Sequence, residues 1–175
     1  MTLKIPNLSA AKKTTATILN IIKPPPELSV SQWADSHRRL SAEASSEAGV
    51  WNTSRAEYQR GIMDAISDDA VETVVIMSCA QVGKTEMLLN LIGFHIEQNP
   101  CPMLVIQPTL DMAQTFSKDR LAPMLRDTPV LKGKVKDARA RDSGNTTLKK
   151  SFAGGHITMC GANSPSSLAS RPIRL

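Results

Sequence analysis

The sequence predicts an α/β fold with a parallel sheet, preceded by a mostly helical N-terminal arm. Two apolar runs, 71–77 and 103–106, have the length and composition of buried strands, and a helical pattern follows each one. Two further runs, 146–152 and 156–160, alternate in polarity on either side of a glycine pair, which indicates a hairpin added at the sheet edge. Strands that alternate with helices are typical of a parallel sheet.

The sequence predicts an arm with one short helix for the N-terminal part of the chain. Residues 1–28 are expected to be weakly ordered and to end in three prolines, which favour an extended conformation. A short helix is expected over 31–40, because Trp33 and Leu40 are seven positions apart and share one face. We place the domain boundary at residue 53, so that 54–175 is the α/β unit.

Helix boundaries follow from capping residues. Residues 54–57 have the sequence of a capping box. The helix that it opens has an apolar side made of Tyr58, Ile62, Met63 and Ile66. A second helix is expected over 87–96, and a third runs from an N-cap at Thr109 or Asp111 to about residue 125.

The turn between the first expected strand and the second helix has the strongest chemical signal. Its residues are Ser78, Cys79, Ala80, Gln81, Val82, Gly83, Lys84 and Thr85. A turn that ends in Gly-Lys-Thr between a strand and a helix holds nucleotide phosphates through a nest of main-chain N–H groups. Gly83 permits close backbone approach, Lys84 would contact the β- and γ-phosphates, and Thr85 would bind Mg²⁺. The phosphate-loop motif begins with glycine where this chain has Ser78, and a chance Gly-Lys-Thr is the alternative.

Tyr58 and Gln59 form a second candidate contact with a nucleotide. They precede Lys84 by about two dozen residues and lie on the expected helix. A glutamine amide can pair with the edge of adenine, and a tyrosine ring can cover the base. The alternative is an exposed glutamine beside a core tyrosine, and the sequence leaves both interpretations open.

The basic residues are concentrated in the C-terminal third. Residues 1–119 hold 10 Lys and Arg against 13 Asp and Glu, whereas 120–175 hold 11 against 3. A one-sided basic stretch can attract a phosphate backbone such as that of DNA. A solvated loop region, or a surface covered by acidic residues of another segment, explains the charge equally well. Arg171 follows the hairpin in a polar loop, which could sense the γ-phosphate or touch DNA, and an inert loop is the alternative.

Composition excludes several classes of protein. At 175 residues and 41% hydrophobic content, the chain has the size and composition of one soluble domain. No apolar run reaches the ~20 residues of a membrane-spanning helix, and the N-terminus has no secretory signal pattern. The three cysteines and three histidines lack the spacing of zinc ligands, and an odd cysteine count fits a reducing cytoplasm.

Nucleotide hydrolysis requires a further motif. An apolar strand ending in Asp-Glu would support Mg²⁺ through the aspartate and activate water through the glutamate. No apolar run of this sequence ends in that pair. We therefore expect the chain to bind a nucleotide, and we expect no turnover by this chain alone.

A set of segments points to one family. They are residues 28–35, 38–45, 49–51, 80–86, 107–109 and 161–165. In this order and spacing they resemble the large terminase subunit of tailed bacteriophages, of the lambda-like GpA family. The resemblance covers the chain from about residue 27 onward, and a phosphate loop without its first glycine is typical of that family. It implies a P-loop NTPase fold of the ASCE (RecA-like) class, with an incomplete parallel sheet.

The resemblance also implies a function. Members of the family are ATPase motors that package double-stranded DNA into procapsids, and they have a nuclease domain that cuts the DNA. By likeness, Lys84 is catalytic, Thr85 is the Mg²⁺ ligand, ATP is the nucleotide, and Tyr58 and Gln59 lie on the adenine side. The implied partners are double-stranded DNA, the small terminase subunit, the portal and procapsid, and further copies of the full-length subunit. The implied location is the host bacterial cytoplasm, with no membrane involved.

Two departures limit what the resemblance implies. Many terminases place an arginine inside the phosphate loop, but this chain has Ala80 and Gln81 there. The charge-stabilising arginine must then come from elsewhere, such as Arg171, or from a neighbouring subunit. The strand ending in Asp-Glu and the nuclease domain have no counterpart, so we expect a fragment truncated before that strand. The alternatives are a helicase-like P-loop ATPase and an inactive prophage remnant or docking module.

Overall fold

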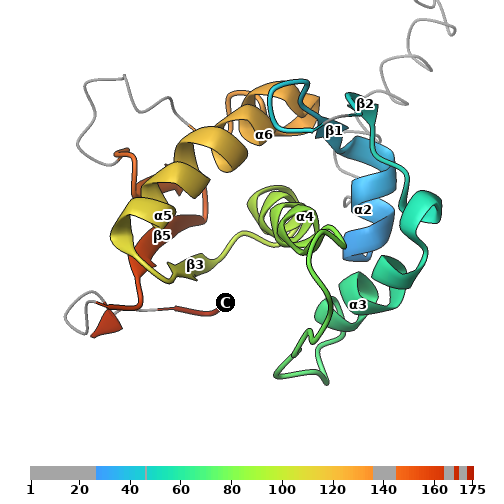
Figure 1. Ribbon diagram of the computed structural model, residues 1–175, viewed down its shortest axis with the longest axis horizontal. Helices are drawn as coiled ribbons and strands as arrows, with labels where there is room; N and C mark the ends of the chain where they lie inside the picture. Colours follow the sequence, from blue (N-terminus) through green and yellow to red (C-terminus); the bar gives the residue numbers. More distant parts are fainter. Residues whose placement is uncertain (1–26, 46, 136–144, 164–167, 170–172) are drawn as a thin grey trace, which may run out of the picture.

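The computed structural model describes most of the α/β unit and the residues from 27 onward in the region before it. The described residues are 27–45, 47–135, 145–163, 168–169 and 173–175. Most of the expected arm and the candidate sensor Arg171 therefore lie outside the described residues. Within these ranges the chain has a mixed α/β fold, in which one central helix is surrounded by further helices and a small sheet (Figure 1).

Three strands form this sheet, in the order β3-β5-β4. They are β3 (Pro102–Gln107), β4 (Lys149–Phe152) and β5 (Gly155–Gly161). β3 and β5 run parallel, with Met103 opposite Ile157, whereas β4 and β5 form an antiparallel hairpin with Lys150 opposite Ile157. The predicted hairpin is confirmed, and parallel pairing is confirmed for β3 and β5. The hairpin differs from the prediction because it supplies the central strand as well as an edge.

The α-helices in the described ranges are α2 (Val30–His37), α3 (Tyr58–Ile66), α4 (Lys84–Glu97), α5 (Leu110–Thr115) and α6 (Ala122–Asp127). α4 is the central helix, and the others lie around it (Figure 1). A π-helical segment, Phe116–Leu121, joins α5 to α6, so the predicted helix up to about residue 125 is confirmed. Thr109 is its N-cap and accepts from the N–H of Met112 at 3.2 Å. None of the helices in the described ranges has the length and apolar character needed to cross a membrane.

Shorter elements connect α2 to α3. They are β1 (Arg39–Leu40), β2 (Gly49–Val50) and a 3₁₀ helix at Thr53–Ala56. A second 3₁₀ helix, Pro129–Leu131, lies elsewhere in the chain and follows α6. β1 and β2 pair antiparallel. The helix expected over 31–40 ends at His37, because Arg38 has extended backbone angles and leads the chain into β1. The domain boundary at residue 53 stays a prediction.

The predicted capping box over 54–57 is wrong. Asn52 caps the 3₁₀ helix instead, because its side-chain oxygen accepts from the N–H of Ser54 at 2.9 Å. The carboxylate of Glu57 is bound by Arg60, whose Nε donates to Oε1 at 2.5 Å. The hydroxyl of Ser54 also accepts from Arg60, at 3.5 Å from Nη2. Both side chains that would form the box therefore have other partners, and α3 begins one turn later than predicted.

The first expected strand, over 71–77, is not part of the sheet in the described structure. The segment belongs to no helix or strand, and Val75 and Met77 are 84% and 98% exposed. An apolar run becomes a strand only where a neighbouring edge can pair with it. Here the free edge of β3 pairs with the C-terminal residues, since the N–H of Leu104 donates to the carbonyl oxygen of Leu175 at 2.9 Å.

The core contains a close contact between α2 and α4. Trp33 is fully buried, and a β-carbon placed on Gly93 of α4 would lie 2.3 Å from its Cη2 atom. The glycine therefore allows the two helices to approach closely. α2 is also joined to α3, because Ser31 Oγ donates to the carboxylate of Asp64 at 2.5 Å. In this way α2 connects the two helices that flank the candidate site.

Candidate functional site

The turn over 78–85 leads directly into α4, as the sequence predicts. Two of its residues have positive φ angles, Gln81 at 63° and Gly83 at 80°, and Gly83 is the N-cap of α4. The N–H of Glu86 donates to the carbonyl oxygen of Gly83 at 3.0 Å. The N–H groups of the two residues before Glu86 lie ahead of the helical hydrogen bonds, so they are available to an anion.

The ammonium group of Lys84 folds back over the turn. Its Nζ donates to the carbonyl oxygen of Cys79 at 2.6 Å and lies 3.3 Å from Ser78 Oγ. The serine that stands in place of the first motif glycine thus contacts the lysine. Lys84 and Thr85 are both exposed. The turn therefore presents a positive charge and a hydroxyl group to the solvent at the start of α4.

Tyr58 and Gln59 donate hydrogen bonds to the same backbone oxygen of the turn. The Tyr58 hydroxyl donates to the carbonyl oxygen of Val82 at 3.0 Å, and Gln59 Nε2 donates to the same oxygen at 2.9 Å. The structure therefore brings both predicted groups together with the predicted turn. Gln59 is 3% exposed and Tyr58 is 59% exposed, so the alternative of an exposed glutamine beside a core tyrosine is wrong.

The remaining amide atom of Gln59 is unsatisfied. Its Oε1 is buried and has no hydrogen-bond partner in the part of the chain that the structure describes. Buried acceptors without a partner are rare in folded proteins and call for an explanation. A ligand that donates a hydrogen bond to this oxygen, next to the turn, would explain why it has no partner among the described residues.

A buried ion pair behind the turn could not be predicted from the sequence. Arg38, which directly follows α2, binds Glu86 in the first turn of α4 with 2.9 Å between Nη2 and Oε2. The two side chains are 3% and 19% exposed. Burial lowers the pKa of Arg38, and the attraction of Glu86 and of Asp127 opposes this shift. An arginine remains charged in such a setting, and no local pattern connects two residues 48 positions apart.

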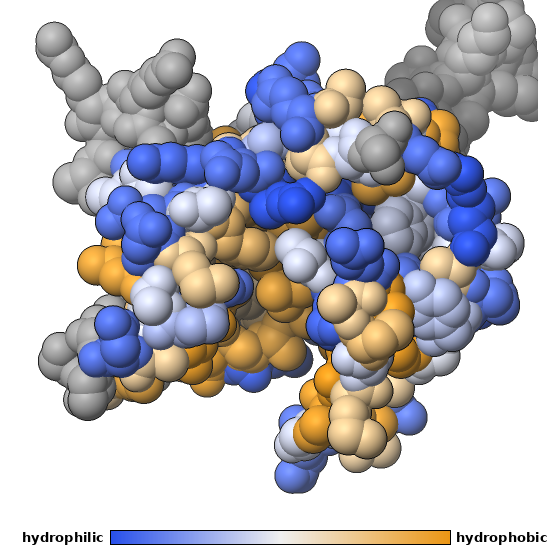
Figure 2. Space-filling model, in the orientation of Figure 1, coloured by the Kyte–Doolittle hydropathy of each residue, from blue (hydrophilic) through white to orange (hydrophobic). Residues whose placement is uncertain are grey.

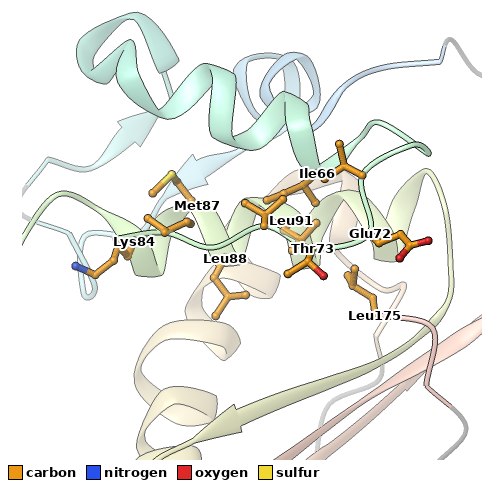
Figure 3. A pocket seen from close by; sticks show the side chains of 11 residues that line it. Ile66, Glu72, Thr73, Lys84, Met87, Leu88, Leu91 and Leu175 are labelled. Carbon is orange, nitrogen blue, oxygen red and sulfur yellow. The ribbon is translucent and has the colours of Figure 1, made fainter. Parts of the chain in front are cut away.

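An apolar cavity of about 300 Å³ lies beside the turn. Most of its lining is apolar and comes from Ile66, Val71, Val74, Ile76, Met87, Leu88, Leu91 and Leu175. Figure 2 shows apolar side chains around a hollow on this side of the molecule. Lys84 lines one end, but its amino group points away from the other labelled side chains (Figure 3). Such a lining does not suit phosphates, so the cavity is distinct from the candidate site.

The basic residues of the C-terminal third are partly neutralised where the structure describes them. Arg126 lies 3.2 Å from the carboxylate of Glu43, and Lys134 lies 3.2 Å from that of Glu97. Other basic residues fall within 136–144, outside the described ranges. An attraction of this stretch to DNA therefore stays a prediction.

Comparisons with known proteins agree on one family. A family model described as phage terminase large subunit gpA, ATPase domain, matches residues 45–175. The chain is 33% identical over 147 residues to the large terminase subunit of Enterobacteria phage P21, which covers 84% of this chain and 22% of that protein. It is 30% identical over 145 residues to the large terminase subunit of Escherichia phage lambda, covering 83% and 22%. No solved structure matches the chain significantly.

The match to the family model extends over the turn and over both helices that flank it. The chain spans about a fifth of the length of the curated relatives it matches. Both relatives are large subunits of a terminase, so the comparisons favour a terminase over the helicase-like alternative. Because the family model matches most of the chain, this protein belongs to the family of the ATPase domain of phage terminase large subunits.

Proposed function

We propose that this chain is the ATP-binding part of a DNA-packaging motor, with a P-loop fold in which residues 78–85 hold Mg·ATP. The observation that carries the proposal is the position of Lys84. Its ammonium group lies over a turn with two left-handed residues at the N-terminus of a helix. Membership in an ATPase domain family supports the proposal.

The residues of the turn suit a phosphate chain with Mg²⁺. The N–H groups at the start of α4 and the Lys84 ammonium would attract the phosphate oxygens. Lys84 is the proposed catalytic residue, because its charge would stabilise the transferring phosphoryl group, and Thr85 would ligate Mg²⁺. A glycine suits position 83 of this turn, because a β-carbon there would lie 2.6 Å from Gln59 Nε2. The remaining wall would come from Ser78, Cys79, Ala80, Gln81 and Val82.

Tyr58 and Gln59 are the proposed adenine side of the site. The unpartnered Oε1 of Gln59 could accept from the exocyclic amine of adenine, which would satisfy it. The exposed ring of Tyr58 could cover the base. Both residues already bind the turn through Val82, so a base held by them would lie close to the phosphate site.

The activity of the whole protein extends the same proposal. The full-length subunit would couple ATP hydrolysis to the packaging of double-stranded DNA into procapsids and would include an endonuclease. Its proposed partners are the small terminase subunit, the portal and further copies of itself, in the host bacterial cytoplasm. Arg171 and a neighbouring subunit stay the two proposed sources of the arginine that senses the γ-phosphate.

For this chain alone we propose nucleotide binding without turnover. Hydrolysis requires a carboxylate that activates water, and no apolar run of the sequence ends in Asp-Glu. The chain would therefore retain ATP in a competitive binding assay and release no phosphate above the background rate.

Calorimetric titration of the chain with Mg·ATP tests this function. The wild type is expected to bind, and Lys84→Ala is expected to lose at least tenfold in affinity, because one charge-assisted contact with phosphate contributes about 1.5–3 kcal/mol. Lys118→Ala is the matched control, since Lys118 is an exposed lysine in the π-helical segment. An equal affinity of Lys84→Ala and wild type would contradict the proposed site. A phosphate-release rate above that of Lys84→Ala would contradict the absence of turnover.

A further inference from the structure

The ion pair between Arg38 and Glu86 lies next to the residues of the candidate phosphate site. Glu86 is the acidic residue in the first turn of α4, and it follows Lys84 and Thr85 directly. A carboxylate at this point lies in the positive field of the helix N-terminus, which is the same field that attracts a phosphate. Without a partner, Glu86 would oppose the binding of an anion at the turn.

Arg38 is the charged partner of Glu86. Its guanidinium lies 2.9 Å from the carboxylate of Glu86 and is nearly inaccessible to water, so the two charges largely cancel when viewed from the turn. The guanidinium is also fixed in place, because Nη1 donates to the carbonyl oxygen of Arg39. Asp127 adds a second negative charge near Arg38 and is itself bound by Arg126.

A closed chain of contacts connects Arg38 to both sides of the candidate site. Arg38 follows α2, and α2 is joined to α3 by the bond from Ser31 to Asp64. α3 carries Gln59, which donates to Val82 in the turn. The turn continues into α4, and the contact between Arg38 and Glu86 returns from α4 to α2. Arg38 therefore lies where the adenine side and the phosphate side of the site are held together.

We propose that Arg38 is a positioning residue that makes the turn selective for polyphosphates by neutralising Glu86. The inference rests on the proposed function, since the anion site is that of ATP. The neutralisation makes the free energy of binding more favourable in proportion to the charge of the ligand. At an effective dielectric constant of about 20, one uncompensated charge about 10 Å from another changes affinity on the order of tenfold. A residue that only packs would affect charged and uncharged ligands alike.

Binding measurements with adenosine, AMP, ADP and ATP separate these two roles. We expect Arg38→Gln to weaken ATP binding about tenfold, ADP binding less, and adenosine binding by less than twofold. The double variant Arg38→Gln with Glu86→Gln is expected to recover ATP affinity to within about threefold of wild type, because no uncompensated carboxylate remains. Arg55→Gln is the matched control, since Arg55 also pairs with a carboxylate, that of Glu47, but is 61% exposed. It is expected to change none of the four affinities.

Equal losses for adenosine and ATP in Arg38→Gln would overturn the proposal, and so would a double variant as weak as the single one. If Arg38→Gln does not fold, Glu86→Gln tests the same idea alone. It is expected to bind ATP at least as tightly as wild type, and a loss of ATP affinity equal to that of adenosine would overturn the proposal. A wild type that binds none of the four ligands would contradict the proposed function as well. A wild type that prefers ATP, with unchanged preference in the variants, would contradict the role of Arg38 only.

Discussion

A β-carbon on Gly83 would lie 2.6 Å from Nε2 of Gln59, so the end of this buried side chain would have to move. The same nitrogen donates to Val82 in the turn at 2.9 Å. Gly83 also has a φ angle of 80°, which residues with a β-carbon adopt at a cost. Two independent requirements, one of space and one of backbone conformation, therefore select glycine at this point of the turn.

Replacing Gly83 by alanine should destabilise the protein. Because the new β-carbon would displace Gln59 and strain the backbone, we expect Gly83→Ala to lower the free energy of unfolding by about 1–3 kcal/mol. Urea denaturation followed by circular dichroism measures this change. The control is Gly61→Ala in α3, where a β-carbon would meet nothing within 4 Å. It should stabilise the protein by up to about 1 kcal/mol, and equal effects of both variants would contradict the packing argument.

Elements with a clear local pattern could be predicted from the sequence. The apolar residues of α4 recur at helical spacing and those of β3 form a short run next to proline, so the sequence predicts both elements, and both are found. The turn with Lys84 is predictable for the same reason, since its motif is local. The chemistry of Tyr58 and Gln59 predicts a contact with the nucleotide, and the structure places both residues against the turn.

Features that depend on distant parts of the chain could not be predicted. The run over 71–77 has the composition of a strand, but composition does not supply the neighbouring edge that a strand requires. Asn52 and Ser54 are both good capping residues, and only the fold decides that Asn52 is used. Arg38 and Glu86 are far apart in sequence, so their pairing follows from the packing of α2 on α4.

The contact of Trp33 with Gly93 predicts a second effect on stability. A β-carbon on Gly93 would lie 2.3 Å from the buried indole, so Gly93→Ala should lower the free energy of unfolding by about 1–3 kcal/mol. A smaller side chain in Trp33→Leu should itself be destabilising, but it relieves the clash. We therefore expect the double variant to be more stable than the sum of the two single changes, by at least 0.5 kcal/mol in a double-mutant cycle. Strict additivity would show that the two residues do not interact.

Because His95 is buried, the free energy of unfolding should decrease in mild acid. Burial lowers the pKa of His95 below its ordinary value of 6.5, and nearby Arg174 lowers it further against the opposing bond to Asn99. Between the two pKa values the unfolded chain binds the proton more readily than the folded chain. The free energy of unfolding should therefore be fully present above pH 6.5 and decrease as the pH falls from 6.5 toward the pKa of the folded state.

Urea denaturation at a series of pH values measures the contribution of His95. In His95→Gln the decrease below pH 6.5 should become smaller, because the group that gains the proton on unfolding is absent. His37→Gln removes a different histidine, on α2, and should retain the decrease of the wild type. Identical pH profiles for wild type and His95→Gln would show that other groups cause the dependence.

Gln59 and Tyr58 donate to the same oxygen, but they should differ in effect because one is buried and the other exposed. Gln59→Leu removes a buried donor, so we expect a loss of about 1–3 kcal/mol in the free energy of unfolding. Tyr58→Phe removes an exposed hydroxyl, and a loss below about 1 kcal/mol is expected. If the unpartnered oxygen of Gln59 recognises adenine, Gln59→Leu should also reduce the preference for ATP over GTP, whereas Tyr58→Phe should leave that preference unchanged. Titration of each variant with both nucleotides measures the ratio of affinities, and an unaltered ratio in Gln59→Leu would assign Gln59 to holding the turn alone.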